Sequence, residues 1–236
     1  MASFGFSQKA ADILEKMIEA KGGRKILESI KDTTMSCWMD TAHPFIKQEI
    51  SPPGVPMKFY HKEPDKFRQD IGEMGKMSFI VLGYDGETTW IFDPLTRIHS
   101  EPPEEQEWAM IKAFNLGNSA LLHPEKYGIT YTYKGKEDFK GWDFLEGLDC
   151  FVLEQTFSNG NKAYLYVDSK THLIHTIKDT MGRIWGRGII FWNYKKVGGV
   201  MFANSITFKY DQWSTMTVKE VIFNTGLEDS LFKRSK

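Results

Sequence analysis

The feature that most constrains this fold is a long succession of short segments in which apolar and polar residues alternate. From Thr33 onward, segments such as TTMSCWMD, VPMKFYHKE, KAYLYVDS and VMFANSITFKY follow one another, separated by Gly, Pro, Asn or Asp. A two-residue period is that of a β-strand, whose successive side chains point to opposite faces. Few of the intervening segments have the length of a crossover helix, which favours an antiparallel sheet over a parallel one.

Turn signals between these segments support the same architecture. Asp85 and Gly86 join two apolar runs in LGYDGETTWIFDP, which predicts a tight β-hairpin. Further turn signals fall at residues 158–161, 168–171 and 198–199, close to the spacing of an antiparallel meander. No linker or low-complexity stretch divides the chain. We therefore expect a mainly β (α+β) protein, with one large curved sheet in a single domain over residues 1–236.

Two stretches depart from this pattern and predict helices. In SQKAADILEKMIEAKGG, Ser7 is the expected N-cap and two glycines end the helix, while the RKILESI segment adds a helical turn, so we expect helices over about residues 7–30. The segments PPEEQEWAMIKAF and NSALLHPEKYG predict an inserted helical segment at about residues 103–126. These helices are too few to cover both faces of a sheet of this size. The sheet must therefore close on itself in part, or bind something in its concavity.

Composition excludes several classes of function. The chain has 30 basic and 31 acidic residues, so no overall field draws it to nucleic acid or to an anionic membrane. No apolar run has the length of a membrane-spanning helix, and the N-terminus carries no export signal. Cys37 and Cys150 form neither a disulfide framework nor a metal motif. Two separate buried thiols and one long-loop disulfide both remain open.

A search for catalytic or metal-binding motifs yields none. His172 and His175 lie three apart in a segment that leads into a strand, where this spacing points them to opposite faces. Gly182, Gly186 and Gly188 lack the strand–loop–helix context of a phosphate-binding loop, and more often mark a bend in a curved sheet. No G-x-S-x-G motif is present. We expect neither catalytic residues, nor a cofactor, nor a metal.

One region resembles a known family. The segment KEPDKFRQDIGEMGKMSFIVLGYDGETTWIFDP resembles the signature region of the periplasmic outer-membrane lipoprotein carriers, the LolA-like family. The matching positions are Pro64, Phe67, Arg68, Asp85, Gly86, Trp90, Phe92, Asp93 and Pro94. The segments ADILEKMIEAKGGRKILESIK, YVDSKTHLIHTIKD and VIFNTGLEDSLF resemble other parts of that family, so the similarity runs over nearly the whole chain.

The resemblance implies an unclosed β-barrel whose open side is covered by helices, and an apolar cavity that shelters acyl chains in transit. It also implies a periplasmic monomer whose export signal has been removed. Its partners would be lipid or acylated protein, exchanged with a membrane-bound donor or acceptor. In the carriers, an Arg that precedes the motif's Pro holds the helical lid shut. Glu63 occupies that position here, which leaves the nearby Arg68 as the candidate latch.

Within such a fold, Trp90 and Phe92 either line the concave wall or pack as plain core beneath the helices. Strand alternation extends the set of candidates for the lining. These candidates are Met57, Phe59, Phe79, Val81, Trp90, Phe92, Tyr131, Tyr133, Phe202, Ile206 and Phe208. The inserted helix would add Trp108, Ile111 and Phe114. The inward faces of DCFVLEQTF and IIFWNY stay undecided, because both of their faces are apolar.

Three functions compete at this stage. The first is carriage of lipid or lipid-modified protein toward the outer membrane, without catalysis. The second is a structural or lipid-sensing interaction module whose barrel is filled by its own side chains. The third is a hydrolase on the same scaffold, which would need a polar cluster inside the barrel that the sequence does not assemble.

Overall fold

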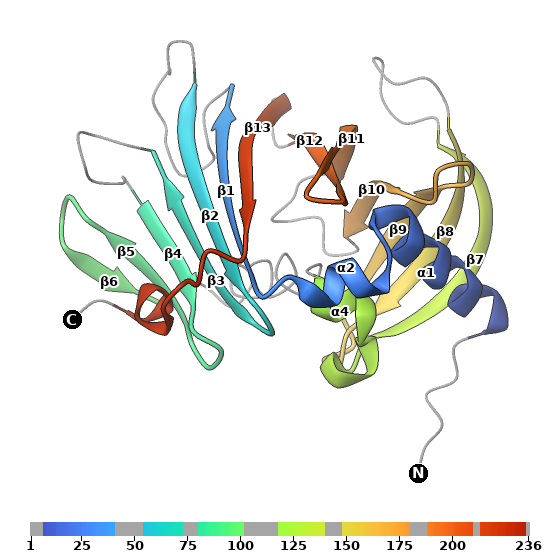
Figure 1. The fold of residues 1–236 in the computed structure, drawn as a ribbon, viewed down its shortest axis with the longest axis horizontal. Coiled ribbons are helices and arrows are strands. Elements are labelled where there is room, and N and C mark those ends of the chain that lie inside the picture. Colours follow the sequence, from blue (N-terminus) through green and yellow to red (C-terminus); the bar gives the residue numbers. More distant parts are fainter. Residues whose placement is uncertain are drawn as a thin grey trace.

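The strands form one open antiparallel sheet. The computed structural model describes residues 7–40, 54–72, 80–101, 118–139, 148–179, 188–209 and 213–234. Within these residues, 13 strands pair in a single curved sheet, and β6 and β7 lie at its two unpaired edges (Figure 1). A mainly β architecture, an unclosed barrel and few helices are therefore confirmed.

The sheet consists of two wings, each a meander. The strands of the first wing are β1 (Asp32–Met39), β2 (Val55–Lys62), β3 (Lys66–Ile71), β4 (Ile80–Tyr84), β5 (Thr89–Asp93) and β6 (Ile98–Ser100). Those of the second wing are β7 (Thr130–Phe139), β8 (Leu148–Thr156), β9 (Lys162–Asp168), β10 (Ile174–Asp179), β11 (Ile189–Val197), β12 (Val200–Lys209) and β13 (Trp213–Phe223). The sheet order is β6-β5-β4-β3-β2-β1-β13-β12-β11-β10-β9-β8-β7, so all neighbours except β1 and β13 are consecutive in the chain.

This topology fixes the course of the inserted segment. Strands β6 and β7 follow one another in sequence yet form opposite edges of the sheet, so residues 101–129 link one edge to the other. The described part of this link contains α4 (Asn118–Leu122) and the 3-10 helix η1 (Pro124–Tyr127). Figure 1 shows α4 between the two wings. The second predicted part of the inserted segment, NSALLHPEKYG, is therefore helical as expected, whereas the predicted helix in PPEEQEWAMIKAF lies outside the described residues.

The N-terminal helices also form as predicted. Helix α1 (Gln8–Lys21) begins at Ser7, whose Oγ accepts a hydrogen bond from the Ala10 backbone N–H. Gly22 ends it at φ 141°, and α2 (Arg24–Ser29) follows. A Cβ on Gly22 would lie 2.8 Å from the carbonyl oxygen of Gly199, so only glycine permits this approach to the β11–β12 turn. The predicted apolar stripe of α1 is buried: Ala10, Ile13, Leu14, Met17 and Ile18.

Register assigns each strand residue to one of two faces. We call the face on which α1 and α4 pack the inner face, and the opposite one the outer face. Ile177 on β10 pairs with Ile189 on β11, and Ile189 pairs with Phe208 on β12. Because directly paired residues share a face, the two large clusters of buried apolar residues both belong to the inner face.

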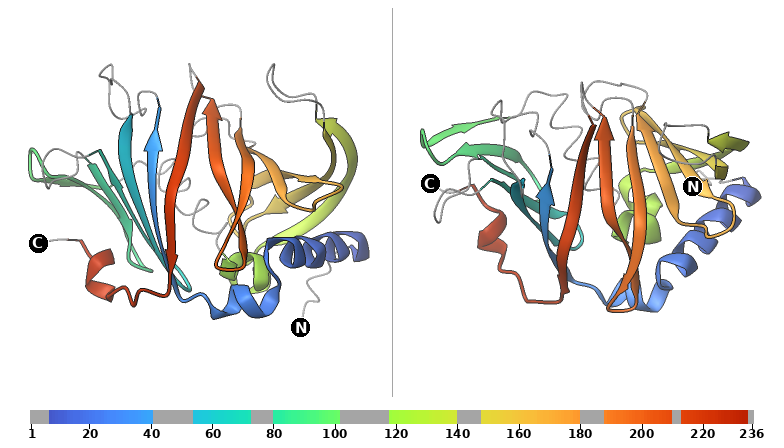
Figure 2. Two further views of the ribbon diagram at one scale, coloured as in Figure 1. Left: turned by 45° about the horizontal axis from the view of Figure 1, so that its top comes forward. Right: turned by 90° about the horizontal axis from the view of Figure 1, so that it is seen from above.

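The C-terminal segment, residues 224–232, lies on the outer face of the first wing, and we call it the C-terminal strap. Asp32 at the start of β1 accepts hydrogen bonds from the backbone N–H groups of Thr225, Gly226 and Leu227. Asp229 then bridges Lys62 and Lys66 at 2.7 Å each. Figure 2 shows this chain running from β13 to the 3-10 helix η2 (Asp229–Phe232), beside the wing that carries β3 to β6.

The two cysteines are free and buried on opposite faces. Cys37 lies in an inner-face cluster, whereas Cys150 lies on the outer face of the second wing with Phe139, Val152 and Tyr166. The sequence left open two separate thiols or one disulfide, and the structure shows two separate thiols. Among the described helices, none combines the length and apolar character that crossing a bilayer requires.

Candidate functional site

The inner face of the first wing and of β11–β13 carries a broad apolar surface, which we call the inner wall. Met57 lies near its centre and is only 3% exposed. All described members of the inner wall come from strands. The buried members are Met35, Cys37, Met39, Val55, Met57, Ile71, Leu82, Ile189, Phe208, Met216 and Val218. Partly buried members are Phe59, Ile80, Ile91, Phe191, Phe202, Ile206 and Val221.

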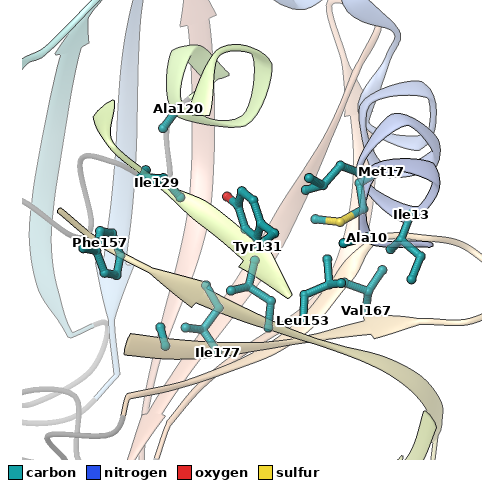
Figure 3. Close-up of a cluster of buried hydrophobic side chains, with 13 residues drawn as sticks. Ala10, Ile13, Met17, Ala120, Ile129, Tyr131, Leu153, Phe157, Val167 and Ile177 are labelled. Atoms are coloured by element: carbon teal, nitrogen blue, oxygen red, sulfur yellow. The ribbon is translucent and has the colours of Figure 1, made fainter. Parts of the chain in front are cut away.

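The rest of the inner face, on β7–β10, is instead covered by helices, and we call it the helix-covered core. It includes four residues of α1 together with Ala120 of α4 (Figure 3). Their strand partners include Leu153, Leu165 and Val167, which are at most 1% exposed. Phe191 packs against both clusters. The inner face is thus one continuous apolar surface, and among its described members helical residues occur only in the helix-covered core.

The predicted lining residues divide between these two regions. Met57 and Phe208 are buried in the inner wall, and Phe59, Phe202 and Ile206 pack against it. Tyr131 and Tyr133 belong to the helix-covered core instead. The Tyr131 hydroxyl accepts a hydrogen bond from Gln155 Nε2 at 3.0 Å, and burial raises its pKa. These two tyrosines therefore pack close to α1 and away from the inner wall.

Three predicted lining residues, Val81, Trp90 and Phe92, lie on the outer face, which corrects the sequence expectation. Leu82 pairs with Ile91 on the inner wall, so the alternating residues must face outward. The alternation was predicted correctly, but its inward side was reversed.

The packing of Trp90 explains this orientation. Its indole N–H donates to the Phe232 carbonyl of the C-terminal strap at 3.0 Å, and its ring lies over Gly83. A Cβ on Gly83 would come within 2.2 Å of that ring. Glycine directly opposite a tryptophan on the neighbouring strand is the sequence signal that could have placed Trp90 on the strap side. Phe92 stacks on His99 with ring centroids 4.5 Å apart, also on the outer face.

The remaining predicted lining residues lie outside the described residues. These are Phe79, Trp108, Ile111 and Phe114. Conversely, sequence reasoning missed Met35, Cys37 and Met39 of the inner wall, although the alternation in TTMSCWMD places exactly these three on one side of the strand.

Arg68 does not serve as a latch for the helices. It lies on the outer face, where its Nε donates to Asp70 Oδ1 at 2.7 Å and its Nη1 donates to the Leu231 carbonyl at 3.2 Å. Since α1 and α4 pack on the inner face, Arg68 holds the C-terminal strap rather than a lid. The prediction that Arg68 latches the helical lid is therefore wrong. The register of β3 pairs Arg68 with Tyr60 and Gly83 on the outer face.

A group of polar side chains meets at the end of the inner wall, and we call it the polar floor. It consists of His61 of β2, Glu63 of the β2–β3 turn, Ser119 of α4 and Tyr127 of η1, together with Lys21 of α1, whose charge acts on His61 and Glu63. The Ser119 hydroxyl donates to Glu63 Oε2, and the Tyr127 hydroxyl donates to the Pro64 carbonyl at 3.0 Å. These two bonds tie the inserted segment to the first wing. Glu63, at the position of the family's Arg, thus itself contacts α4.

Burial dominates the electrostatics of the polar floor. It raises the pKa of Glu63, whose side chain is 12% exposed, against the opposing effects of Ser119 and Lys21. Burial lowers the pKa of Lys21 to about 8, and Glu63 partly opposes this. The pKa of His61 falls to about 4, first because of burial and second because of Lys21. At neutral pH, His61 is therefore uncharged and Lys21 mostly protonated.

The polar floor does not form a nucleophile–base pair of the serine hydrolase kind. A serine hydroxyl has one proton to donate, and that of Ser119 goes to Glu63 rather than to His61. His61 Nδ1 lies 3.9 Å from Glu63 Oε1, beyond hydrogen-bonding distance. A triad requires the serine to donate to the histidine and the histidine to the acid. The observed order of contacts is suited to holding α4 and to binding polar groups.

A small groove of about 150 Å³ lies between α1, α2 and the α4–η1 segment. Its apolar lining includes Leu14, Ile18 and Leu121. At its rim, Arg24 pairs with Glu15 at 2.7 Å and donates to the Leu122 carbonyl at 3.3 Å. The groove shows that helices α1 and α4 meet across an incompletely filled seam.

Solved structures of other proteins share this architecture. A LolA superfamily protein, NE2245 from Nitrosomonas europaea, superposes with a TM-score of 0.59 at 16% identity, over 95% of this chain and 97% of that one. The chain has a LolA-like fold. A DUF1329 family protein from Desulfovibrio piger shares this LolA-like fold, with a TM-score of 0.62, 13% identity and the same coverage of 95% and 97%. No protein-family model matches the sequence, and no curated protein sequence matches it.

Proposed function

We propose that this protein is a non-catalytic carrier that binds lipid or lipid-modified protein against the inner wall. The observation that carries the proposal is the inner wall itself: an apolar surface that spans strands from β5 to β11 and whose described members all come from strands. A ligand reaches this surface only when its cover opens, because the buried members are at most 9% exposed.

The energetics of a carrier fit this arrangement. Each buried CH₂ of an acyl chain contributes about 0.8 kcal/mol, so one 16-carbon chain gains on the order of 12 kcal/mol before losses. A carrier must shelter that surface and still release it. Here Ser119 of α4 and Tyr127 of η1 tie the inserted segment to the first wing through one charge-assisted and one neutral hydrogen bond at the polar floor. Such bonds contribute only about 0.5–3 kcal/mol each, so the inserted segment can separate from the first wing at a small cost in free energy.

The direction of transport rests on fold likeness alone. We propose a periplasmic location, exchange with a membrane-bound donor or acceptor, and delivery toward the outer membrane. The support is that residues 62–94 resemble the signature region of the periplasmic lipoprotein carriers, which share the LolA-like fold. No role for nucleic acid is proposed, because the net charge of -1 offers no attraction to it.

A second candidate function has one observation in its favour. The helix-covered core is filled by side chains, with Ala10, Ile129 and Leu153 each at 0% exposure. The inner wall is buried to a similar extent, with Ile71 at 0% and Met57 at 3% exposure, and a protein whose own side chains fill it would be a structural or lipid-sensing interaction module. The two functions differ in whether apolar ligand enters at all.

Native mass spectrometry on protein purified from its own host distinguishes these functions. We expect an adduct with the mass of a lipid that disappears after extraction with organic solvent. The delipidated protein should then take up an apolar fluorescent probe, and a long-chain lipid should displace it. Protein that carries no adduct and takes up no probe would instead favour the filled interaction module.

A further inference from the structure

We propose that the polar floor binds the head group of the ligand, and that this head group is a neutral hydroxyl. The inference rests on the proposed function, because it names the class of amphiphile that the inner wall and the polar floor accept together.

The first support is that the polar floor continues directly from the inner wall. Along β2, the inner face presents Val55, Met57 and Phe59 and then His61. Phe59 and Phe67 lie with ring centroids 6.3 Å apart, and Phe67 pairs with His61, which confirms that these residues share the face. At about 3.3 Å per residue, the stretch from Val55 to His61 spans roughly 20 Å. A long apolar chain lying along it ends at polar groups.

The second support is a buried acceptor without a hydrogen-bond partner among the described residues. Glu63 Oε2 accepts from Ser119, whereas Glu63 Oε1 is buried and accepts none there. A buried acceptor left unsatisfied costs about 1–3 kcal/mol, and more when the group is charged. A ligand that donates a hydrogen bond to Glu63 Oε1 would remove this cost. Neither a plain hydrocarbon nor a carboxylate can do so.

Charge selects among the possible donors. Lys21 acts electrostatically on both Glu63 and His61, and Lys31 acts on Glu63 as well. An ammonium head could donate to Glu63 Oε1 but would face two like charges, Lys21 and Lys31, against the one opposite charge of Glu63. A carboxylate head would bring acceptors and a like charge against Glu63 Oε1. A hydroxyl avoids both repulsions. It can donate to Glu63 Oε1 without adding a charge to the site.

The test compares ligands of one chain length that differ only in the head. The full-length protein is loaded with an apolar fluorescent probe at neutral pH, and the probe is displaced with dodecane, dodecanol, dodecanoate or dodecylamine. We expect dodecanol to displace the probe at a concentration about tenfold lower than either charged ligand, which corresponds to about 1.4 kcal/mol. Dodecanoate or dodecylamine binding as tightly as dodecanol would overturn the inference.

Three variants locate the effect. Glu63→Leu removes the acceptor and should abolish the preference for dodecanol over dodecane. Ser119→Ala removes the tie to α4 but keeps Glu63 Oε1, so the preference should persist. Ile222→Ser, at an exposed position on the outer side of β13, should match the wild type. Loss of the preference in Ser119→Ala, or its persistence in Glu63→Leu, would contradict a head-group role for Glu63.

The outcome also separates this inference from the carrier function. If wild-type protein binds all four ligands equally, the inner wall is an apolar site and the head-group inference fails alone. If it binds none of them, including dodecane, the proposed carrier function fails and the head-group inference fails with it.

Discussion

The helix-covered core and the inner wall occupy the same face of the same sheet, and their described members come from different elements. Strands β7–β10 present Leu153 and Leu165 to the apolar stripe of α1, so the chain supplies its own cover there. The described members of the inner wall come from strands alone. Strand alternation therefore identifies an apolar face but not what lies against it. A helix-covered core and an apolar face that we propose binds a ligand can look identical in sequence.

The largest expected effect is on the helix-covered core. Leu165 is 1% exposed and packs in the cluster that contains α1. Leu165→Ala should lower the free energy of unfolding by about 2–5 kcal/mol, because it leaves a cavity between helix and sheet. Chemical denaturation measures this change. The affinity of the folded variant for an apolar probe should stay within about twofold of wild type, because Leu165 lies outside the inner wall. A twofold change in affinity corresponds to under about 0.5 kcal/mol. A large loss of probe binding by the folded variant would break the division into two regions.

The next effect concerns pH and the polar end of the inner wall. Burial and Lys21 lower the pKa of His61 to about 4 in the folded state, whereas an unfolded histidine titrates near 6.5. Between these values the unfolded chain binds the proton and the folded one does not. Stability contributed by neutral His61 is therefore present above pH 6.5 and is lost as the pH falls toward 4, by up to about 3 kcal/mol.

Urea denaturation at a series of pH values measures this slope, and His61→Gln is the matched variant because glutamine does not titrate. We expect the variant to lose the part of the slope between pH 6.5 and 4 while retaining the contributions of the carboxylates, including Glu63. An unchanged slope in His61→Gln would mean that His61 is solvated and that the polar floor is open to water.

A third prediction concerns the inner wall directly. Met57→Trp adds bulk at its centre and should weaken binding of an apolar probe by at least about tenfold, or about 1.4 kcal/mol. Ile222→Trp adds similar bulk at an exposed position on the outer face, and should leave binding unchanged. Fluorescence titration compares the two. Equal binding by both variants would indicate that the ligand does not lie on the inner wall.

The smallest effect tests the reversed face of β5. Trp90→Phe removes the hydrogen bond to the Phe232 carbonyl of the C-terminal strap and should cost about 1 kcal/mol of stability. Probe affinity should not change, because Trp90 lies on the outer face. A clear loss of probe affinity in this variant would return Trp90 to the ligand site.

Local signals predicted the elements of the fold well. Ser7, the stripe of α1 and the paired glycines specified the first helix, and the two-residue period specified the strands. Which side of a strand faces inward depends on partners distant in sequence, and this is where prediction failed. Trp90 faces outward because Gly83 makes room for it and the C-terminal strap covers it. Gly83 lies within the segment LGYDGETTWIFDP, whereas Phe232 of the strap lies 142 residues further along the chain than Trp90.

The polar floor shows the same limit. In sequence, Glu63 marks only the absence of the family's Arg. In the structure, residues from α1, β2, α4 and η1 surround it, and Glu63 itself contacts α4 through Ser119. Its role follows from tertiary contacts between segments up to about a hundred positions apart, and no local pattern encodes them.

The most direct test of the central claim is to map where a lipid chain lies. Delipidated protein would be loaded with a long-chain lipid bearing a photoreactive group on its tail, irradiated, digested and analysed by mass spectrometry. We expect cross-links on the inner wall, in the peptides that contain Val55–Phe59 and residues 202–208. Cross-links confined to the peptides of Trp90 or Leu165, or none at all, would contradict a ligand surface on the inner wall.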